Sequence, residues 1–187
     1  EQLEQELTKN KFIRNSNYGS NEIYSVSYSD SPCILKEIGR LRELAFRNAG
    51  GGTGKELDLD EYDTMPGGYK QLIVWDPKRK EIVGGYRYLL CKDTHFDENG
   101  VPDLATSHLF NFSPKFIEHY MPYMIELGRS FVQPNFQATT SDRRGIFALD
   151  NLWDGLGALI ILHPEIKYFF GKVTMYPDFN RKARDIM

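Results

Sequence analysis

Two arginines occur in segments that are otherwise apolar, which suggests a buried charged site. Arg87 belongs to a predicted strand over residues 82–90, and Arg129 to a predicted strand over residues 124–132. Because side chains alternate along a strand, each guanidinium is expected to share its face with apolar neighbours. Those neighbours are Val83, Gly85 and Leu89 for Arg87, and Ile125, Leu127 and Phe131 for Arg129. An unpaired buried charge is costly, so each arginine requires a carboxylate partner.

Asp60, Asp63 and Glu126 are the nearest acidic residues without another evident role. Strict alternation points Glu126 to the opposite face from Arg129, but Gly128 between them could host a bulge that re-aims one side chain. Two interpretations stay open. The cluster is either a structural ion-pair network or the wall of an acceptor site. In the second case Glu126 accepts a proton from an amine, directly or through a water, and the aspartates bind an ammonium or hold the arginines.

The elements that position these residues alternate between strands and helices. Strands are predicted at 22–29, 69–75, 82–90, 124–132 and 167–175, and helices near the start of the chain, from Pro32 to the glycines at 50–52, after Ser113 and at 145–162. Ser31 is the predicted N-cap of the second helix. The last helix has a predicted apolar stripe of Phe147, Leu149, Leu152, Trp153, Leu156, Leu159 and Ile160. Trp75 and Trp153 are assigned to the core. The pattern predicts one α/β domain over residues 1–187 on a mixed sheet.

Bulk properties exclude several classes of protein. The 187 residues carry a net charge of −3, which disfavours a broad electrostatic contact with nucleic acid. No stretch approaches the roughly 18 uncharged apolar residues of a membrane span. The two cysteines and four histidines lack metal-ligand spacing, so we expect no metal, and cysteine usage suits a reducing cytoplasm. The chain begins at Glu1 and stops at Met187 inside a charged run, so we expect cuts in a longer protein, with truncation at the C-terminus.

Four short motifs occur in a fixed order over residues 38–162. They are Leu-Arg-Glu-Leu-Ala-Phe at 41–46, Asp-Leu-Asp-Glu-Tyr-Asp at 58–63, Gly-Tyr-Arg at 85–87 and Glu-Leu-Gly-Arg-Ser-Phe-Val at 126–132. With this order and spacing the chain resembles the GNAT-like acyltransferases, which include acyl-homoserine-lactone synthases, ornithine-lipid N-acyltransferases and proteins labelled hemolysins. Segments 37–42, 51–54 and 151–155 are most similar to the hemolysin-like, amino-lipid branch.

The resemblance implies a GNAT-like fold, with a mixed, mostly antiparallel central sheet flanked by helices. It implies N-acylation of a small amino acid, ornithine or glycine, for amino-lipid synthesis. The donor would be a fatty acyl thioester of acyl carrier protein or coenzyme A, with no permanently bound cofactor. The protein would be cytoplasmic, peripheral to the inner membrane where its lipid product associates.

The resemblance also assigns roles to residues. The catalytic residues would be Glu126, Arg129 and Arg87. The acceptor would be bound by Asp60, Asp63, Arg42 and Phe46, and the donor by Phe131, Val132, Arg143, Arg144 and Gly145. Arg42 is equally consistent with a solvated helix residue.

The segment 139–145 occupies the place of the donor-binding loop of GNAT enzymes. It has one glycine and departs from their usual glycine-rich pattern, which disfavours a coenzyme A pyrophosphate cradle and favours a carrier-protein donor. Arg143 and Arg144 would then meet the acidic carrier. Two alternatives stay open. One is a lactone-type signal synthase using S-adenosylmethionine, although the glycine-rich loop at 50–54 lacks the tryptophan usual there. The other is a non-catalytic lipid-binding or membrane-active protein.

Overall fold

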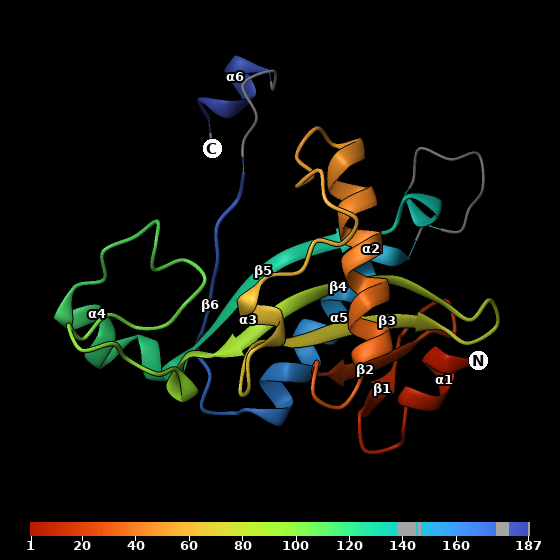
Figure 1. The fold of residues 1–187 in the computed structure, drawn as a ribbon, viewed down its shortest axis with the longest axis horizontal. Coiled ribbons are helices and arrows are strands. Elements are labelled where there is room, and N and C mark those ends of the chain that lie inside the picture. The colour runs from red at the N-terminus through yellow and green to blue at the C-terminus, as the bar shows by residue number, and fades with distance from the viewer. Residues whose placement is uncertain (138–144, 146, 175–179, 187) are drawn as a thin grey trace.

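The computed structural model describes residues 1–137, 145, 147–174 and 180–186. Its six strands form one sheet in chain order (Figure 1). They are β1 (Phe12–Asn15), β2 (Glu22–Val26), β3 (Lys70–Asp76), β4 (Glu81–Leu90), β5 (Met124–Val132) and β6 (Tyr168–Phe170). Strands β1 to β5 pair antiparallel, whereas β6 pairs in parallel with β5. The predicted mixed, mostly antiparallel sheet is confirmed.

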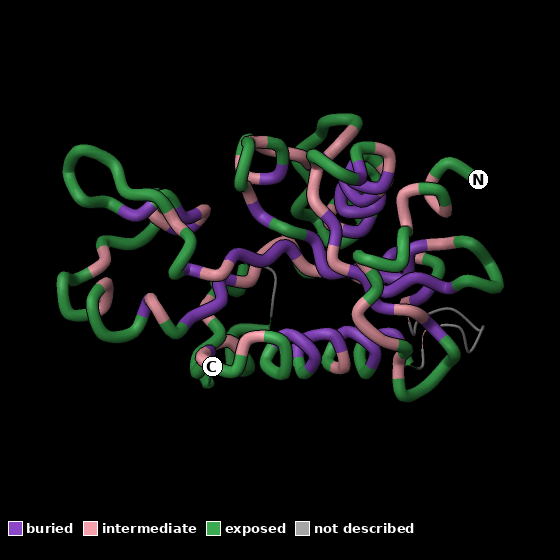
Figure 2. Tube along the Cα trace, turned by 90° about the horizontal axis from the view of Figure 1, so that it is seen from below, coloured by how far each residue is buried: buried purple, intermediate pink, exposed green. Residues whose placement is uncertain are grey.

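Helices lie on both faces of this sheet (Figures 1 and 2). The α-helices are α1 (Gln2–Glu6), α2 (Pro32–Asn48), α3 (Glu61–Thr64), α4 (Pro114–His119), α5 (Ala148–Leu162) and α6 (Arg181–Arg184), with short 3-10 turns η1 (Cys91–Asp93), η2 (Met121–Tyr123) and η3 (Pro134–Phe136). The predicted spacing of α2 buries Ile34, Leu35, Ile38 and Leu41 against Ile73, Trp75 and Phe131. On the opposite face α5 buries Leu152, Leu156 and Leu159 against Ile23, Leu72 and Val74. We call the side of the sheet that α2 covers the α2 face, and the side that α5 covers the α5 face.

The start of α2 differs from the predicted cap. Ser31 is the N-cap residue, but its side chain accepts no bond from the helix. The Glu6 carboxylate at the end of α1 accepts instead from the backbone N–H groups of Cys33 at 3.0 Å and Ile34 at 2.9 Å. A negative charge is favourable at a helix N-terminus, so Glu6 replaces the expected serine cap and fixes α1 on α2.

Two edges of the sheet differ from the prediction. Strand β1 was not predicted, because a run of four residues that includes Arg14 and Asn15 is too short and polar to show alternation. Strand β6 covers Tyr168–Phe170, whereas the predicted strand spans 167–175, of which Met175 lies outside the described residues. The apolar residues of this region therefore pair with β5 over a short length only.

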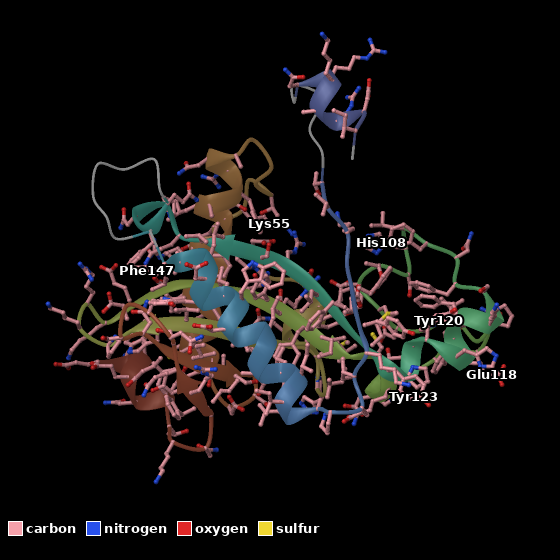
Figure 3. The ribbon with its side chains drawn as sticks, turned by 180° about the vertical axis from the view of Figure 1, so that it is seen from behind. Lys55, His108, Glu118, Tyr120, Tyr123 and Phe147 are labelled. Atoms are coloured by element: carbon pink, nitrogen blue, oxygen red, sulfur yellow. The ribbon has the colours of Figure 1, made fainter. Side chains whose placement is uncertain are left out.

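Helix α5 carries apolar residues on both its buried and its outer sides. Leu149 is 64% exposed and Trp153 is 67% exposed, and Phe147 and Ile160 are exposed as well. The predicted stripe is therefore wrong for these four residues, and Trp153 is not a core residue. Figure 3 shows α5 lying across the sheet with Phe147 at its beginning, where this ring stacks on Tyr18 at 5.5 Å between centroids. No described helix combines the length and apolar character needed to cross a membrane.

The segment 151–155, which carried part of the family resemblance, has a structural explanation. The Asp154 carboxylate accepts from the backbone N–H of Asn17 at 2.8 Å, which ties the turn between β1 and β2 to α5. A Cβ on Gly155 would lie 2.3 Å from Leu72 Cδ2, so a larger residue would force the buried Leu72 side chain or the helix to shift. These residues therefore fix the helix on the sheet and do not reach the charged cluster.

Candidate active site

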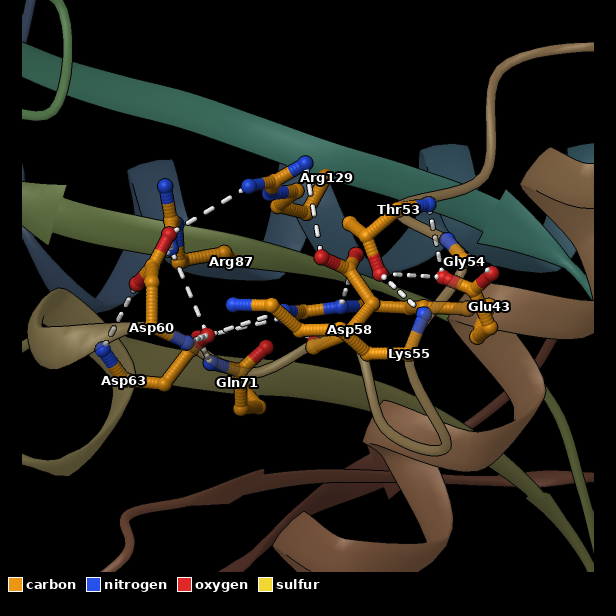
Figure 4. Close-up of polar contacts among 11 residues, drawn as sticks. Glu43, Thr53, Gly54, Lys55, Asp58, Asp60, Asp63, Gln71, Arg87 and Arg129 are labelled. Atoms are coloured by element: carbon orange, nitrogen blue, oxygen red, sulfur yellow. Dashed lines mark hydrogen bonds and ion pairs between the residues drawn. The ribbon is translucent and has the colours of Figure 1, made fainter.

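Figure 4 shows Asp58, Asp60 and Asp63 close to Arg87 and Arg129. Arg42 joins this cluster on the α2 face of the sheet through ion pairs with Asp58 and Asp63. Arg42 comes from α2, Arg87 from β4 and Arg129 from β5, while Asp58, Asp60 and Asp63 come from α3 and the segment before it. Asp60 is the N-cap of α3 and forms a capping box with Asp63. The Asp60 carboxylate accepts from the backbone N–H of Asp63, and the Asp63 carboxylate accepts from the backbone N–H of Asp60. This motif holds both carboxylates rigidly toward the strands.

Arg42 and Asp63 form the innermost part of this cluster. The Arg42 side chain is fully buried, with Nη2 2.8 Å from Asp63 Oδ2 and Nε 3.1 Å from Asp58 Oδ2. Gln71 on β3 donates a further bond to Asp63 at 2.9 Å. Arg42 is therefore not a solvated helix residue. Of the two roles considered for Asp63, the structure favours holding the arginines, because its carboxylate is enclosed by protein donors.

Asp60 links the other two arginines. Arg87 Nη1 lies 2.6 and 2.7 Å from the two Asp60 oxygens, and Arg129 Nη2 lies 3.3 Å from Oδ2. Burial alone would raise the pKa of Asp60, but the two guanidinium groups outweigh it and lower the pKa to about 2. The Arg87 guanidinium also lies over the ring of Tyr69, 5.0 Å from its centroid. At neutral pH Asp60 is therefore ionised between the two guanidinium groups.

A β-bulge places Arg129 in this cluster. Arg87 pairs with Gly128 and Gly85 with Phe131, so that two β5 residues, Arg129 and Ser130, oppose Tyr86 alone on β4. Arg129 has a φ of 50°, a conformation that costs a residue other than glycine about 1–3 kcal/mol. The extra residue turns Arg129 toward the α2 face, where Glu126 also lies. The expected bulge is present, one residue beyond Gly128.

The bulge overturns the neighbours that alternation predicted for Arg129. Ile125 and Leu127 pack on the α5 face, so only Phe131 of the predicted set shares the side of Arg129. A second irregularity occurs on β4, where Trp75 pairs with Ile82 and Val74 with Gly84, leaving Val83 as the extra residue. Val83 therefore packs on the α5 face, away from Arg87, contrary to the prediction.

Glu126 is buried beside Tyr69, and no arginine of the described residues forms an ion pair with it. The Tyr69 hydroxyl donates a short bond to Glu126 Oε2 and accepts the backbone N–H of Ala105 at 2.8 Å. Burial raises the pKa of Glu126 and outweighs the bond from Tyr69, which lowers it. Burial and the nearby Glu126 charge also raise the pKa of Tyr69. A raised pKa makes the Glu126 carboxylate a stronger base than an ordinary carboxylate, which favours its accepting a proton.

The predicted donor residues are placed differently from one another. The Phe131 side chain is buried on the α2 face, and Val132 packs on the α5 face, so these residues offer only backbone to a ligand. Gly145 lies against the Phe136 carbonyl, which a Cβ would approach to 1.9 Å. Arg143 and Arg144 lie outside the described residues. Phe46, predicted to bind the acceptor, packs partly buried against the core on the α2 face.

The edge of β5 opens beside Glu126. Strand β6 pairs with Met124, Ile125 and Glu126, whereas β5 continues to Val132. Within the described part of the chain no strand pairs with β5 on this side beyond Glu126. The Val132 carbonyl on this edge accepts from Gln137 Nε2 at 2.9 Å, and Gly171 lies against the Leu127 carbonyl. Between these two points no strand of the described residues pairs with the edge, so its backbone groups could bind an extended ligand such as a pantetheine arm.

Sequence analysis missed three residues of the cluster. Asp58 pairs with Arg42 and Arg129, Tyr69 holds Glu126, and Gln71 supports Asp63. Asp58 belongs to the same acidic motif as Asp60, so its inclusion was detectable from spacing. Tyr69 and Gln71 were assigned only to a strand, and nothing in their local sequence distinguishes them.

The chain is similar to several known proteins. Residues 41–144 match the family described as the acetyltransferase (GNAT) domain. A glycine N(alpha)-acyltransferase of Phocaeicola vulgatus is 58% identical over 99% of the chain, and one of Bacteroides thetaiotaomicron is 58% identical over 100%. The chain spans 57% and 56% of these relatives' lengths. A solved aminoglycoside acetyltransferase from an uncultured soil sample is 15% identical, with a TM-score of 0.43 over 90% of this chain and 89% of its own.

Proposed function

The chain belongs to the GNAT acetyltransferase family, and from this premise we propose that it transfers an acyl group from a thioester to the α-amino group of glycine. The observation that carries the proposal is the 58% identity to two glycine N(alpha)-acyltransferases over essentially the whole chain. The charged cluster and the open edge of β5 lie within the segment that defines the family match. Ornithine has the same α-amino and carboxylate groups and is the natural competing acceptor.

Glu126 is the proposed base. The ammonium of the acceptor loses one proton to the Glu126 carboxylate, directly or through a water, and the neutral nitrogen attacks the thioester carbonyl carbon. The carbon–sulfur bond then breaks, and the second amine proton leaves with the thiol. The products are an N-acyl amino acid and a free thiol, and Glu126 returns its proton to solvent. The raised pKa of Glu126 and its bond to Tyr69 support this assignment.

The donor is proposed to lie along the open edge of β5. Backbone N–H groups in this position would stabilise the oxyanion of the tetrahedral intermediate. Acyl carrier protein and coenzyme A carry the same phosphopantetheine arm, and the single glycine at 139–145 favours the carrier protein. A long acyl chain on that carrier would make the product a lipid, which would associate with a membrane surface.

The test is a transfer assay with purified protein. Long-chain acyl carrier protein or acyl coenzyme A is incubated with glycine, ornithine or S-adenosylmethionine, while thiol release and product mass are followed. We expect N-acylglycine, and its loss in Glu126→Gln. A lactone product from S-adenosylmethionine would instead establish the signal synthase. No transfer, combined with lysis of lipid vesicles that survives Glu126→Gln, would establish the membrane-active alternative.

A further inference from the structure

Strand β5 has an open position on its α2 face at Gly128. Apart from its chain neighbours Leu127 and Arg129, a Cβ built on Gly128 would meet one atom of the described residues within 4 Å, Arg87 Nε at 3.8 Å. The backbone of Gly128 does not adopt a positive φ, so its conformation does not require glycine. The missing side chain therefore leaves space in front of Arg87, between Glu126 and the bulged Arg129.

Two cationic groups lie beside this space, one with a buried donor that lacks a partner among the described residues and one that is partly exposed. Arg87 is 5% exposed, and its Nε–H has no partner among the described residues, although a buried donor normally has one. Arg129 is 34% exposed, and its ion pairs with Asp58 and Asp60 are 3.5 and 3.3 Å long.

The two aspartates do not depend on Arg129 for their pairing. Asp58 also pairs with Arg42 at 3.1 Å, and Asp60 with Arg87 at 2.6 Å. Arg129 can therefore turn toward a ligand while both carboxylates keep a partner. Its strained backbone conformation is consistent with a functional reason for an arginine at this position.

We propose that the acceptor lies over Gly128, with its carboxylate between Arg87 Nε–H and the Arg129 guanidinium. The amino group then points along β5 toward Glu126. This inference rests on the proposed function and deepens it, because it names the residues that select a small α-amino acid. The carboxylate receives two charge-assisted hydrogen bonds, and the α-carbon occupies the volume that a side chain on residue 128 would fill.

Two substitutions test different parts of this site. Arg129→Gln removes the charge that binds the carboxylate, so KM for glycine should rise roughly 10- to 100-fold, as expected for the loss of a hydrogen bond to a charged group. KM for glycinamide, which has the amine but no carboxylate, should change little. Glycine and glycinamide differ in the reactivity of their amines, so the quantity to compare is the ratio of their two KM values. This ratio is measured in the wild-type protein and in the variant, and the difference in amine reactivity is the same in both. Arg40→Gln, at an exposed arginine paired with Glu37 on α2, is the matched control.

Gly128→Ala fills the proposed acceptor site without disturbing the fold, since a Cβ at 3.8 Å from Arg87 Nε makes an ordinary contact. KM should rise at least about tenfold for both acceptors, since a methyl group would occupy their space, while the melting temperature is kept. Gly157→Ala on α5 is the matched control, because a Cβ there meets nothing within 4 Å.

Equal changes for glycine and glycinamide in Arg129→Gln, or a wild-type KM in Gly128→Ala, would overturn the proposal. If the wild-type protein acylates neither acceptor, the proposed transfer reaction fails, and glycine binding is then measured by NMR titration. Glycine binding that is weakened by both substitutions would still support the proposed acceptor site. Absence of glycine binding to the wild-type protein would overturn it.

Discussion

Replacing Asp63 with asparagine removes one charge from the centre of the cluster at nearly constant volume. Asp63 accepts from Arg42 Nη1 at 3.1 Å, from Nη2 at 2.8 Å and from Gln71 at 2.9 Å. The NH₂ group of an asparagine would face at least one of these N–H groups, so that two donors would meet and a hydrogen bond would be lost. Asp63→Asn thus leaves the fully buried Arg42 with a single ionised partner, Asp58.

Breaking a buried ion pair by removing one partner costs about 3–5 kcal/mol. Because Asp58 still pairs with Arg42, we expect the lower end, about 3 kcal/mol. For a domain of this size that loss lowers the melting temperature by about 6–12 °C. It is also a large part of the roughly 5–15 kcal/mol by which domains are stable.

The measurement is urea unfolding at pH 7, followed by circular dichroism. Asp103→Asn, at an exposed aspartate, is the control and should lose less than about 0.5 kcal/mol. A loss below about 1 kcal/mol in Asp63→Asn would refute the reasoning. It would mean that Arg42 reaches water or another partner, and that the network is not a rigid support for the strands.

Three further results are expected. Because burial raises the pKa of Glu126, the transfer rate should fall as pH decreases through that pKa. Glu126→Gln should abolish this fall in rate at low pH and lower kcat about 10²- to 10⁴-fold. A fall in rate that survives the substitution would show that another residue is the base. The pKa of Asp60 falls to about 2 in the folded state, so its stabilisation is present above the unfolded pKa and lost as pH falls toward 2. Asp60→Asn should therefore lose roughly 2 kcal/mol in urea unfolding at pH 7 and almost nothing near pH 2; a loss independent of pH would contradict the ion pairs. Trp153 is 67% exposed and Trp75 is 3% exposed, so acrylamide should quench Trp75→Phe strongly and Trp153→Phe weakly. The reverse order would show that the outer side of α5 is covered.

Hydrophobic periodicity predicted the elements of this fold because most of them obey it. The buried side of α2 follows regular helical spacing, and its burial is confirmed. Strands β3 and β4 were recognised from their β-type residues and the turn between them, and they are buried along most of their length. Alternation failed at Val83 and Arg129, since one extra residue moves every later side chain to the other face. A bulge depends on pairing with the neighbouring strand, and its exact position is not encoded in the local sequence.

The charged cluster was only partly predictable for a related reason. The arginines stood out because their strands are apolar, and the acidic motif supplied partners of opposite charge. Which carboxylate meets which guanidinium depends on α3, whose four residues are too few to show a helical period. The pairing of Glu126 with Tyr69 depends on the sheet register and on the backbone of Ala105, neither of which local spacing determines.

The strands lie in the sheet in the order in which they occur in the chain. During folding, each strand can therefore pair with the strand next to it in the chain once that strand has formed. The β3–β4 hairpin closes the shortest loop and should form earliest in folding, with Gln71 and Arg87 on its two strands. Strand β2 precedes that hairpin by the whole length of α2 and α3, so its pairing closes a longer loop. We therefore expect Arg42 and Asp63 to be buried late, when α2 and α3 settle on a sheet that is already assembled.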